Sequence, residues 1–523
     1  MVKEEIKKII GKAAEKSLNI KLEEINIEVP AQEKFGDYTA NIALILAKKL
    51  NEKPLAVAGR IAEEARSLNS GLFEKIEVVS PGFINFFLSR QYLQNQVRKI
   101  LRQKDRFGFL KAAKKQKVNV EFVSANPTGP LTAGNGRGGF CGDVLANVLQ
   151  RAGHSVKREY LINDVGRQIK QLGDSITGHG NTYRGAYIEE LKKRVKTKNP
   201  YKAGQEAAAI ILQEMIKPSL KKAGIKFDIW FLESWLYRKK QVEKTLKWLE
   251  KKGYAYRKEG ALWFKSTAFG DDKDRVLIKS NGEKTYFASD IAYLKNKFKR
   301  GFNKLIFLWG ADHYGYVKRM QAAVAVLGHG KEQAEFILMQ LVKLFRGGKE
   351  VRMSKRKGTY ITLDEIINEI GLDAARFFFL MRSPGNHLNF DLDLAKERSE
   401  KNPVYYVQYA YARISSILRR APAKMRNSAF DSSFLNSPAE LKLIRQLLRF
   451  PEIIEDTAKD YQVQRLPRYA LETASFFHQF YDKCRILGEK SEISRARLAL
   501  IKATKIVLEN ALDLMGISAP EKM

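Results

Sequence analysis

Residues 117–162 read KVNVEFVSANPTGPLTAGNGRGGFCGDVLANVLQRAGHSVKREYLI. Residues 118–123 are mostly apolar and predict a buried strand, and residues 155–162 predict a second one. Between them, prolines and glycines at 127–139 predict a loop, and residues 143–152 predict a helix. A strand, a helix and a second strand in this order form a βαβ unit, which is typical of a parallel sheet.

The segment before this unit predicts a small mixed α/β domain. Apolar residues recur at helical spacing near the N-terminus, and alternating strands are predicted at 25–29, 76–78 and 83–86. Asp37 is expected to cap a helix over residues 41–50.

The segment after the unit predicts a larger arrangement of several parts. Residues from about 166 to 270 are rich in helix formers and lysine and predict an insertion. An apolar strand follows at 305–309, and beyond residue 385 nearly the whole chain predicts helix.

The charge balance indicates a polyanionic partner. The 523 residues include 93 Lys and Arg against 58 Asp and Glu, a net charge of +35. Such an excess attracts phosphate backbones, although a lysine-rich surface without a ligand would have the same composition.

The remaining composition excludes several classes of protein. Two cysteines far apart in the sequence exclude a disulfide framework and a cysteine-rich zinc site. No apolar run approaches the roughly 20 residues of a membrane span, so we expect a cytoplasmic protein without membrane contact.

The glycines of the loop also permit an alternative function. Gly134, Gly136 and Gly139 fit the GxGxxG pattern of dinucleotide-binding proteins, with Glu159 twenty residues further on. That pattern requires its first glycine directly after the strand, whereas Gly134 lies eleven residues beyond Val123. An NAD-binding enzyme is therefore the less favoured alternative.

Five blocks of the sequence resemble class I arginyl-tRNA synthetases, in the order of that family. They are VEFVSANPTGPLTAGNGRGGFCGDVLANVLQRAGHSVKREYLINDVGRQ (120–168), TYFASDIAY (285–293), WGADHYGY (309–316), RMSKRKGTYITLDEIINEIGLDAARFFFLMRS (352–383) and NPVYYVQYAYARI (402–414). The resemblance implies an α/β fold with three parts. These are an N-terminal tRNA-binding α/β domain (1–95), a Rossmann-like parallel-sheet catalytic domain (117–385, with the helical insertion) and an all-helical anticodon-binding domain (386–523).

The resemblance also implies the reaction. A member of this family attaches L-arginine to tRNA-Arg through arginyl-adenylate, consumes ATP with its Mg²⁺, and releases AMP and pyrophosphate. It would act in the cytoplasm, as a monomer.

Two signatures depart from the family pattern. Where the family has His-x-Gly-His, this chain reads Thr132-Ala133-Gly134-Asn135, and the second signature, KMSKS, reads RMSKR at 352–356 with Lys355 retained. Thr and Asn donate hydrogen bonds but cannot carry positive charge, and one lost donor to a developing anion can cost about 3 kcal/mol. A non-catalytic tRNA-binding relative therefore stays open as an alternative.

The resemblance assigns a role to each candidate residue. Catalytic residues are Lys355, Thr132 and Asn135. Arginine contacts are Glu121, Ser124, Asn126, Tyr286, Asp290 and His313. ATP contacts are Pro130, Thr132, Gly134, Asn135, Gly136, Asp312, Met353, Ser354 and Lys355, and no residue is assigned to a metal. Contacts with tRNA are Phe35, Tyr38, Tyr405, Gln408, Tyr409 and Arg413.

The chemistry of arginine agrees with one of these assignments in particular. A guanidinium is always charged, so a buried site for it needs a fixed carboxylate. Tyr286 and Asp290 are four residues apart and share one face if they lie on a helix. In the family the carboxylate matching Asp290 receives the guanidinium.

Overall fold

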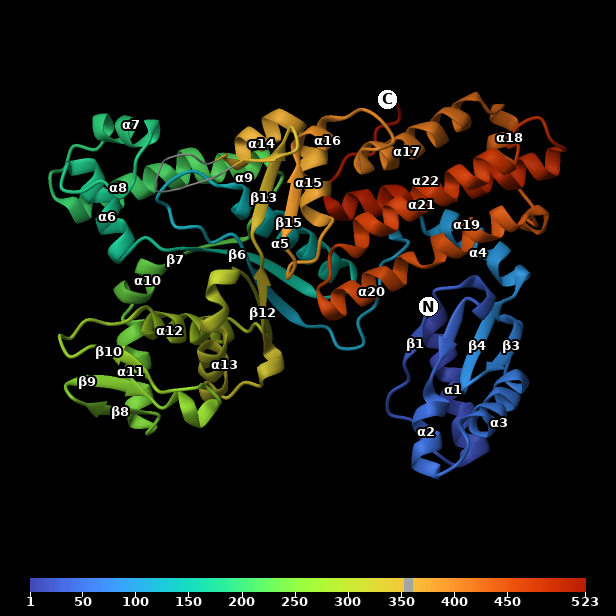
Figure 1. Ribbon diagram of the computed structural model, residues 1–523, viewed down its shortest axis with the longest axis horizontal. Coiled ribbons are helices and arrows are strands. Elements are labelled where there is room, and N and C mark those ends of the chain that lie inside the picture. Colours follow the sequence, from blue (N-terminus) through green and yellow to red (C-terminus); the bar gives the residue numbers. More distant parts are fainter. Residues whose placement is uncertain (352–360) are drawn as a thin grey trace.

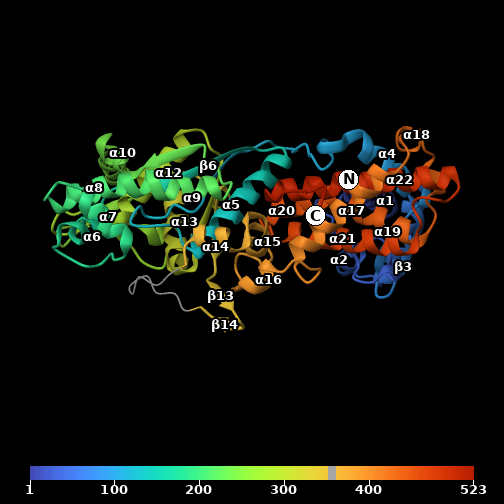
Figure 2. The ribbon, with the colours of Figure 1, turned by 90° about the horizontal axis from the view of Figure 1, so that it is seen from above.

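The computed structural model describes residues 1–351 and 361–523. The predicted ATP contacts Met353, Ser354 and Lys355 lie outside the described residues. The chain forms an elongated molecule with an α/β region at one end and a helical bundle at the other, as Figures 1 and 2 show.

The predicted βαβ unit is confirmed as the centre of a five-stranded parallel sheet. The strand order is β12-β11-β5-β6-β7. Its strands are β5 (Lys117–Glu121), β6 (Ser155–Ile162), β7 (Ile229–Leu232), β11 (Lys304–Gly310) and β12 (Ala334–Met339). The chain order reverses between β5 and β11, and in open α/β sheets ligands bind beyond the carboxyl ends of the strands at such a point.

The helix after β5 starts earlier than predicted. α5 runs from Ala133 to Arg151 and includes the glycines that we expected in a loop. Two of those glycines allow close packing, since a Cβ at Gly139 would lie 2.8 Å from Ile225 Cδ1 and a Cβ at Gly136 would lie 2.7 Å from Leu363 Cδ1. The tertiary contact thus explains the glycine content without a turn.

Two groups of elements lie outside the sheet in this part of the chain, and strand β7 separates them. We expected a single insertion at about 166–270. The first excursion holds α6 (Arg167–Thr177), α7 (Ala186–Arg194), α8 (Pro200–Ile211) and α9 (Lys217–Lys222), and it returns to the sheet as β7. The second holds α10 (Glu233–Arg238), α11 (Gln241–Lys251), β8 (Ala255–Lys258), β9 (Ala261–Phe264) and β10 (Arg275–Ile278). Strand β7 is a run of only four apolar residues, which is too short for periodicity to separate it from the helices around it.

The remaining elements of this region follow in the chain and connect the α/β region to the helical bundle. They are α12 (Tyr286–Lys299), α13 (Val317–Val326), β13 (Val342–Arg346), β14 (Lys349–Glu350), α14 (Leu363–Ile370), α15 (Leu372–Leu380), β15 (Leu388–Asp391) and α16 (Leu392–Lys396). Strands β14, β13 and β15 form a small separate sheet.

The N-terminal domain is a four-stranded antiparallel sheet packed against helices, in the strand order β1-β2-β4-β3. Its elements are α1 (Val2–Leu18), β1 (Ile27–Glu28), β2 (Tyr38–Ala40), α2 (Ile42–Leu50), α3 (Pro54–Ser67), β3 (Phe73–Val79), β4 (Phe83–Leu88) and α4 (Arg90–Gln103). The predicted helix cap at Asp37 is wrong, because Asn41 occupies the N-cap of α2. Asp37 accepts a hydrogen bond from the Leu88 backbone N–H at 2.7 Å instead.

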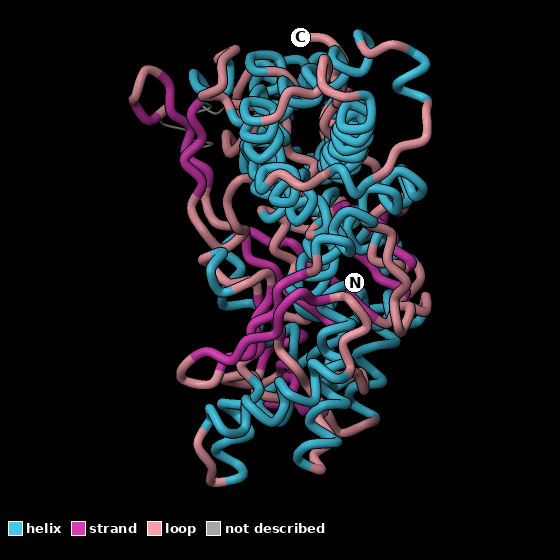
Figure 3. Tube along the Cα trace, turned by 90° about the vertical axis from the view of Figure 1, so that its right-hand side faces the viewer, coloured by secondary structure: helices cyan, strands magenta, loops and turns pink. Residues whose placement is uncertain are grey.

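The C-terminal region is helical, as predicted. Its helices are α17 (Pro403–Arg420), α18 (Ala423–Asn427), α19 (Pro438–Leu448), α20 (Phe450–Asp460), α21 (Arg465–Lys483) and α22 (Ser491–Met515). Figure 3, a view along the long axis, shows this bundle above the N-terminal domain. No described helix is long and apolar enough to cross a membrane.

Polar contacts hold the N-terminal domain against the bundle. The Tyr38 hydroxyl donates to Glu452 Oε1 at 3.0 Å, and Arg445 Nε pairs with Asp37 Oδ1 at 2.7 Å. Burial raises the pKa of Glu452. Residues 37 and 38 therefore serve a contact between domains.

Candidate functional site

The candidate site lies beyond the carboxyl ends of β5 and β11, where the chain order of the sheet reverses. After β5 the backbone turns sharply, with φ of 64° at Val123 and 35° at Ser124. Left-handed conformations cost energy for residues other than glycine, most of all for a β-branched one, and they cluster at ligand sites. The Ser124 hydroxyl accepts the Leu161 backbone N–H at 3.0 Å, which fixes this turn against β6.

A buried charge network lies under this turn. Glu121 at the end of β5 is 4% exposed and pairs with Lys297 Nζ on α12 at 2.9 Å. The same ammonium lies 3.3 Å from Glu159 Oε1. Burial alone would raise the pKa of Glu159, but Lys297 and Arg300 hold it at about 2. Both carboxylates are therefore held in place by charged partners.

Asp290 lies on α12, one helical turn after Tyr286, as the spacing predicted. Its Oδ2 accepts a hydrogen bond from the Tyr316 hydroxyl, which comes from the 3₁₀ turn after β11 (Ala311–Tyr316). Burial raises the pKa of Asp290 to about 7, and the nearby carboxylates of Glu233 and Glu121 add to that effect. The Tyr316 hydroxyl and Arg319 act in the opposite direction but do not offset the burial, so a cation bound there would favour the ionised form.

Glu233 adds a further acid that the sequence analysis missed. It begins α10, is 5% exposed, and accepts a hydrogen bond from Ser289 Oγ at 2.8 Å. Burial raises its pKa, as does the carboxylate of Asp164. Its one sequence signal was its place directly after an apolar strand, and that strand lay inside the presumed insertion.

Two other predicted arginine contacts, Asn126 and Tyr286, lie after β5 and at the start of α12. Asn126 accepts from Asn163 Nδ2 and donates to Gln168 Oε1, both at 2.7 Å. Tyr286 is 59% exposed, and its hydroxyl accepts the Arg167 backbone N–H at 3.4 Å.

The turn after β11 carries two further predicted contacts, His313 and Asp312. The His313 side chain is half exposed and lies near the Trp309 ring, with 5.5 Å between ring centroids. Asp312, the predicted ATP contact, is exposed beside it.

The altered signature forms the N-terminus of α5. Thr132 is the N-cap, and its backbone N–H and its hydroxyl both donate to Asn135 Oδ1 at 3.0 Å. Gly134 is exposed at the same end. The first N–H groups of a helix lack partners within the helix, and the helix dipole adds positive potential, so this end suits an anion.

The segment that follows the second signature contacts the first signature directly. The Leu363 backbone N–H donates to Leu131 O at 2.9 Å, and Thr132 and Thr362 form an isolated β-bridge. A Cβ at Gly136 would lie 2.7 Å from Leu363 Cδ1, so α14 packs this closely only against glycine. Pro130 precedes this contact and is half-buried.

Aromatic, polar and charged side chains, including the acids Glu400 and Asp482, line a cavity of about 670 Å³ on the helical bundle. Tyr405, Tyr409 and Arg413 of α17 line it together with His478 of α21. Arg413 lies over the rings of Tyr409 and Tyr481, at 5.1 and 4.7 Å from their centroids. Stacked aromatics beside a cation suit an unpaired base.

Two predicted tRNA contacts do not face solvent. Tyr38 is 3% exposed in the domain contact described above, and Gln408 is 8% exposed. Gln408 Nε2 donates to Asp373 Oδ2 at 2.8 Å and to Ser518 O at 3.0 Å. These positions correct the prediction for both residues, because each side chain is already used inside the protein. Phe35 is half-buried, with Lys34 Nζ 4.9 Å from its ring centroid.

The geometry contradicts the dinucleotide alternative. The three glycines of the GxGxxG pattern lie within α5, past its first residue, and do not form a turn after β5. Glu159 is fully buried and bound to Lys297 and Arg300, so it cannot reach a ribose. The described residues hold no group of three or more His, Cys, Asp or Glu arranged for a metal ion.

Comparison with known proteins matches nearly the whole chain. Family models match residues 2–88 (arginyl tRNA synthetase N terminal domain), 96–193 and 186–380 (tRNA synthetases class I (R), catalytic domain) and 407–523 (DALR anticodon binding domain). The chain is 45% identical to an arginine–tRNA ligase of Carboxydothermus hydrogenoformans, over 95% of this chain and 94% of that protein. It is 44% identical to an arginine–tRNA ligase of Desulforamulus reducens, over 98% and 97%. In fold it is similar to Thermus thermophilus arginyl-tRNA synthetase, with a TM-score of 0.82 at 23% identity, covering 100% of both chains.

Proposed function

Since this chain belongs to the arginyl-tRNA synthetase family and is an arginine–tRNA ligase, we propose how its residues divide the work of that reaction. The observation that carries the assignment is Asp290, a carboxylate on α12 whose pKa is raised by burial and by the neighbouring acids Glu233 and Glu121. The alternative of a non-catalytic relative has no such reason to keep an acidic pocket.

The guanidinium of arginine binds Asp290. The bound guanidinium lowers the pKa of Asp290. Its two N–H donors also compensate the carboxylate for the solvation that it loses on burial. Glu233 lies close enough to add negative potential without a direct contact. Glu121 and Asn126, at the end of β5 and in the loop after it, hold the α-ammonium end, with Ser124 fixing the turn between them.

ATP binds at the N-terminus of α5. The backbone N–H groups of that end, with Thr132 and Asn135, donate to phosphate oxygens in place of the family histidines. Lys355 supplies the positive charge that Thr and Asn lack. Mg²⁺ enters on the ATP phosphates, as is usual for nucleotide sites.

The reaction needs no nucleophile from the protein. The arginine carboxylate attacks the α-phosphorus of ATP, the bond to the β-phosphate oxygen breaks, and pyrophosphate leaves. A ribose hydroxyl of the terminal tRNA adenosine then attacks the arginyl carbonyl, and AMP leaves. The protein contributes position and electrostatic stabilisation.

The tRNA binds the helical bundle, with unpaired bases in the cavity lined by Tyr405, Tyr409 and Arg413. The net charge of +35 favours such a partner. The working boundaries are 1–95, 117–385 and 386–523. We place the protein in the cytoplasm as a monomer.

The decisive test is charging of a tRNA-Arg transcript with labelled arginine, ATP and Mg²⁺, beside lysine and citrulline. Citrulline matches arginine in shape but is neutral, so it should give no detectable product. Charging of arginine alone is the expected result. Binding of tRNA without charging would overturn the assignment of a working site.

The pH profile tests the role of Asp290. Only its ionised form can pair with a guanidinium, and its pKa in the free protein is about 7. The value of kcat/KM for arginine should therefore fall about tenfold from pH 8 to pH 6, because kcat/KM follows the pKa of the free enzyme. Pyrophosphate exchange measures it, and a flat profile would contradict this role.

The Tyr409→Ala variant tests the cavity on α17. Stacking of one base is worth about 1–3 kcal/mol, so the Kd for tRNA should rise roughly tenfold or more. The slope of log Kd against log salt should not change, since tyrosine carries no charge. Tyr201→Ala on α8 is the matched control, because Tyr201 is 39% exposed and Tyr409 is 37% exposed. Equal Kd values for both variants, measured by filter binding, would refute the assignment.

A further inference from the structure

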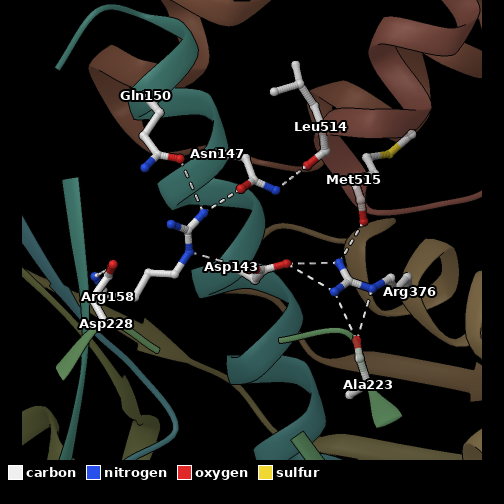
Figure 4. Close-up of polar contacts among 9 residues, drawn as sticks. All are labelled: Asp143, Asn147, Gln150, Arg158, Ala223, Asp228, Arg376, Leu514 and Met515. Carbon is white, nitrogen blue, oxygen red and sulfur yellow. Dashed lines mark hydrogen bonds and ion pairs between the residues drawn. The ribbon is translucent and has the colours of Figure 1, made fainter. Parts of the chain in front are cut away.

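A buried arginine, Arg376 of α15, joins four separate segments of the chain (Figure 4). It is 1% exposed. Nη1 and Nη2 each lie 3.0 Å from Asp143 Oδ2 on α5. Nη1 also donates to Met515 O at 2.8 Å, while Nη2 and Nε donate to Ala223 O at 2.9 and 3.2 Å. The guanidinium thus uses all of its nitrogens in one buried node.

Two helices end at this guanidinium. Ala223 follows α9, and Met515 is the last residue of α22, so both carbonyls belong to helix C-termini. Such carbonyls lack partners within the helix and carry the negative end of its dipole, which favours a cation. Gly516 then turns the chain with φ of 66°, and a Cβ there would lie 2.4 Å from Arg376 Nη1.

A second layer of contacts strengthens the same connection. Asp143 Oδ1 lies 3.5 Å from Arg158 Nε of β6, and Arg158 also donates to Asn147 Oδ1. Asn147 Nδ2 in turn donates to Leu514 O at 2.9 Å (Figure 4). The last turn of α22 is thus bound by α5 through Asn147 and by α15 through Arg376.

The node connects the two ends of the molecule that the reaction uses. Asp143 lies on the same helix as Asn135, and α15 follows α14, which contacts the first signature. On the other side, the segment after α22 reaches α17, because Asp373 of α15 accepts from both Ser518 N and Gln408 Nε2. Gln408 lies on the helix that carries Tyr405 and Tyr409.

We infer that Arg376 and Asp143 are positioning residues that couple RNA binding on α17 to the orientation of α5, and thereby to ATP binding at its N-terminus. The inference rests on the proposed function, because it takes the α17 cavity as an RNA site. A displacement of α17 reaches α15 and the end of α22 through Gln408, Asp373 and Ser518. The planar guanidinium of Arg376 then transmits this displacement to Asp143.

The test compares tRNA affinity with and without the nucleotide site occupied. The full-length protein is titrated with tRNA-Arg, alone or with saturating arginine and a non-hydrolysable ATP analogue. The ratio of the two Kd values is the coupling, and reciprocity gives the same factor for the effect of tRNA on the combined binding of arginine and the analogue. The wild type should show at least about fivefold coupling, within the usual range for linked sites.

Arg376→Lys should bring this ratio to within about twofold of one, because lysine keeps the charge but loses the five-donor fork. Arg137→Lys is the matched control. Arg137 is also buried on α5, at 1% exposure, but it donates to the carbonyls of Gln340, Ser383 and Asn386, outside the bundle. It should keep the wild-type ratio, even with a lower melting temperature.

Asp373→Ala covers the case in which Arg376→Lys does not fold, since Asp373 is only half-buried. Its coupling should be at least about threefold below that of the wild type, because it removes the contacts with Gln408 and Ser518. Full coupling in a folded Arg376→Lys or in Asp373→Ala, or equal loss in Arg137→Lys, would overturn the inference. If the wild-type protein binds tRNA without coupling, this inference fails and the proposed function stands. If the wild-type protein does not bind tRNA, the proposed function fails as well.

Discussion

Asp290→Asn should raise the KM for arginine by roughly 100-fold, with the KM for ATP unchanged. The variant keeps the shape of the side chain and an acceptor for the Tyr316 hydroxyl, but it removes the charge that receives the guanidinium. Loss of one partner from a buried charged pair costs about 2–5 kcal/mol, and each 1.4 kcal/mol is tenfold. Pyrophosphate exchange at varied arginine concentration measures the effect.

Tyr316→Phe is the matched control for this variant. It removes the hydroxyl that donates to Asp290 and leaves the carboxylate, so we expect less than about a tenfold change. The pH dependence of kcat/KM should persist in Tyr316→Phe and disappear in Asp290→Asn. A KM for arginine within threefold of the wild type in Asp290→Asn would show that the guanidinium binds elsewhere.

Asn135→Ala should lower the kcat of pyrophosphate exchange by roughly 100-fold. Its amide lies at the N-terminus of α5, where the family has a histidine, and one preorganised donor to a developing anion is worth about 10²–10³ in kcat. The variant also removes the acceptor for Thr132, so the free energy of unfolding should fall by about 1 kcal/mol.

Asn135→His separates these two effects. Histidine restores a donor that can carry positive charge, so kcat should equal or exceed the wild-type value, although the contact with Thr132 changes. Thermal unfolding of both variants, followed by circular dichroism, reports the helix cap independently of catalysis. Equal kcat values for Asn135→Ala and the wild type would place the phosphate donors elsewhere.

Local spacing explains why part of the site could be predicted from the sequence. Tyr286 and Asp290 lie four residues apart, and a single helix places them on one face, whatever surrounds it. The strands β5 and β11 were likewise predicted, because each contains a short, mostly apolar segment beside a turn. These features depend on neighbours in the chain.

Other features depend on residues that are distant in sequence. Lys297 neutralises Glu121, and Glu233 contacts Ser289 across 56 positions, so no local pattern indicated either partner. Gly136 and Gly139 predicted a loop, but they pack against Leu363 and Ile225 inside a helix. We expected Tyr38 and Gln408 at the surface, because the segments that bury their side chains are distant in sequence.

The sequence by itself determined the central βαβ unit, the helical C-terminal region and the family, because periodicity and motif spacing act over a few residues. Only the tertiary structure decided which charges meet. It placed Glu121 on Lys297, Tyr38 on Glu452, and Arg376 between the ends of α9 and α22. The physical reason is that burying a charge is costly without a partner, and the partner is supplied by whichever segment the packing brings near.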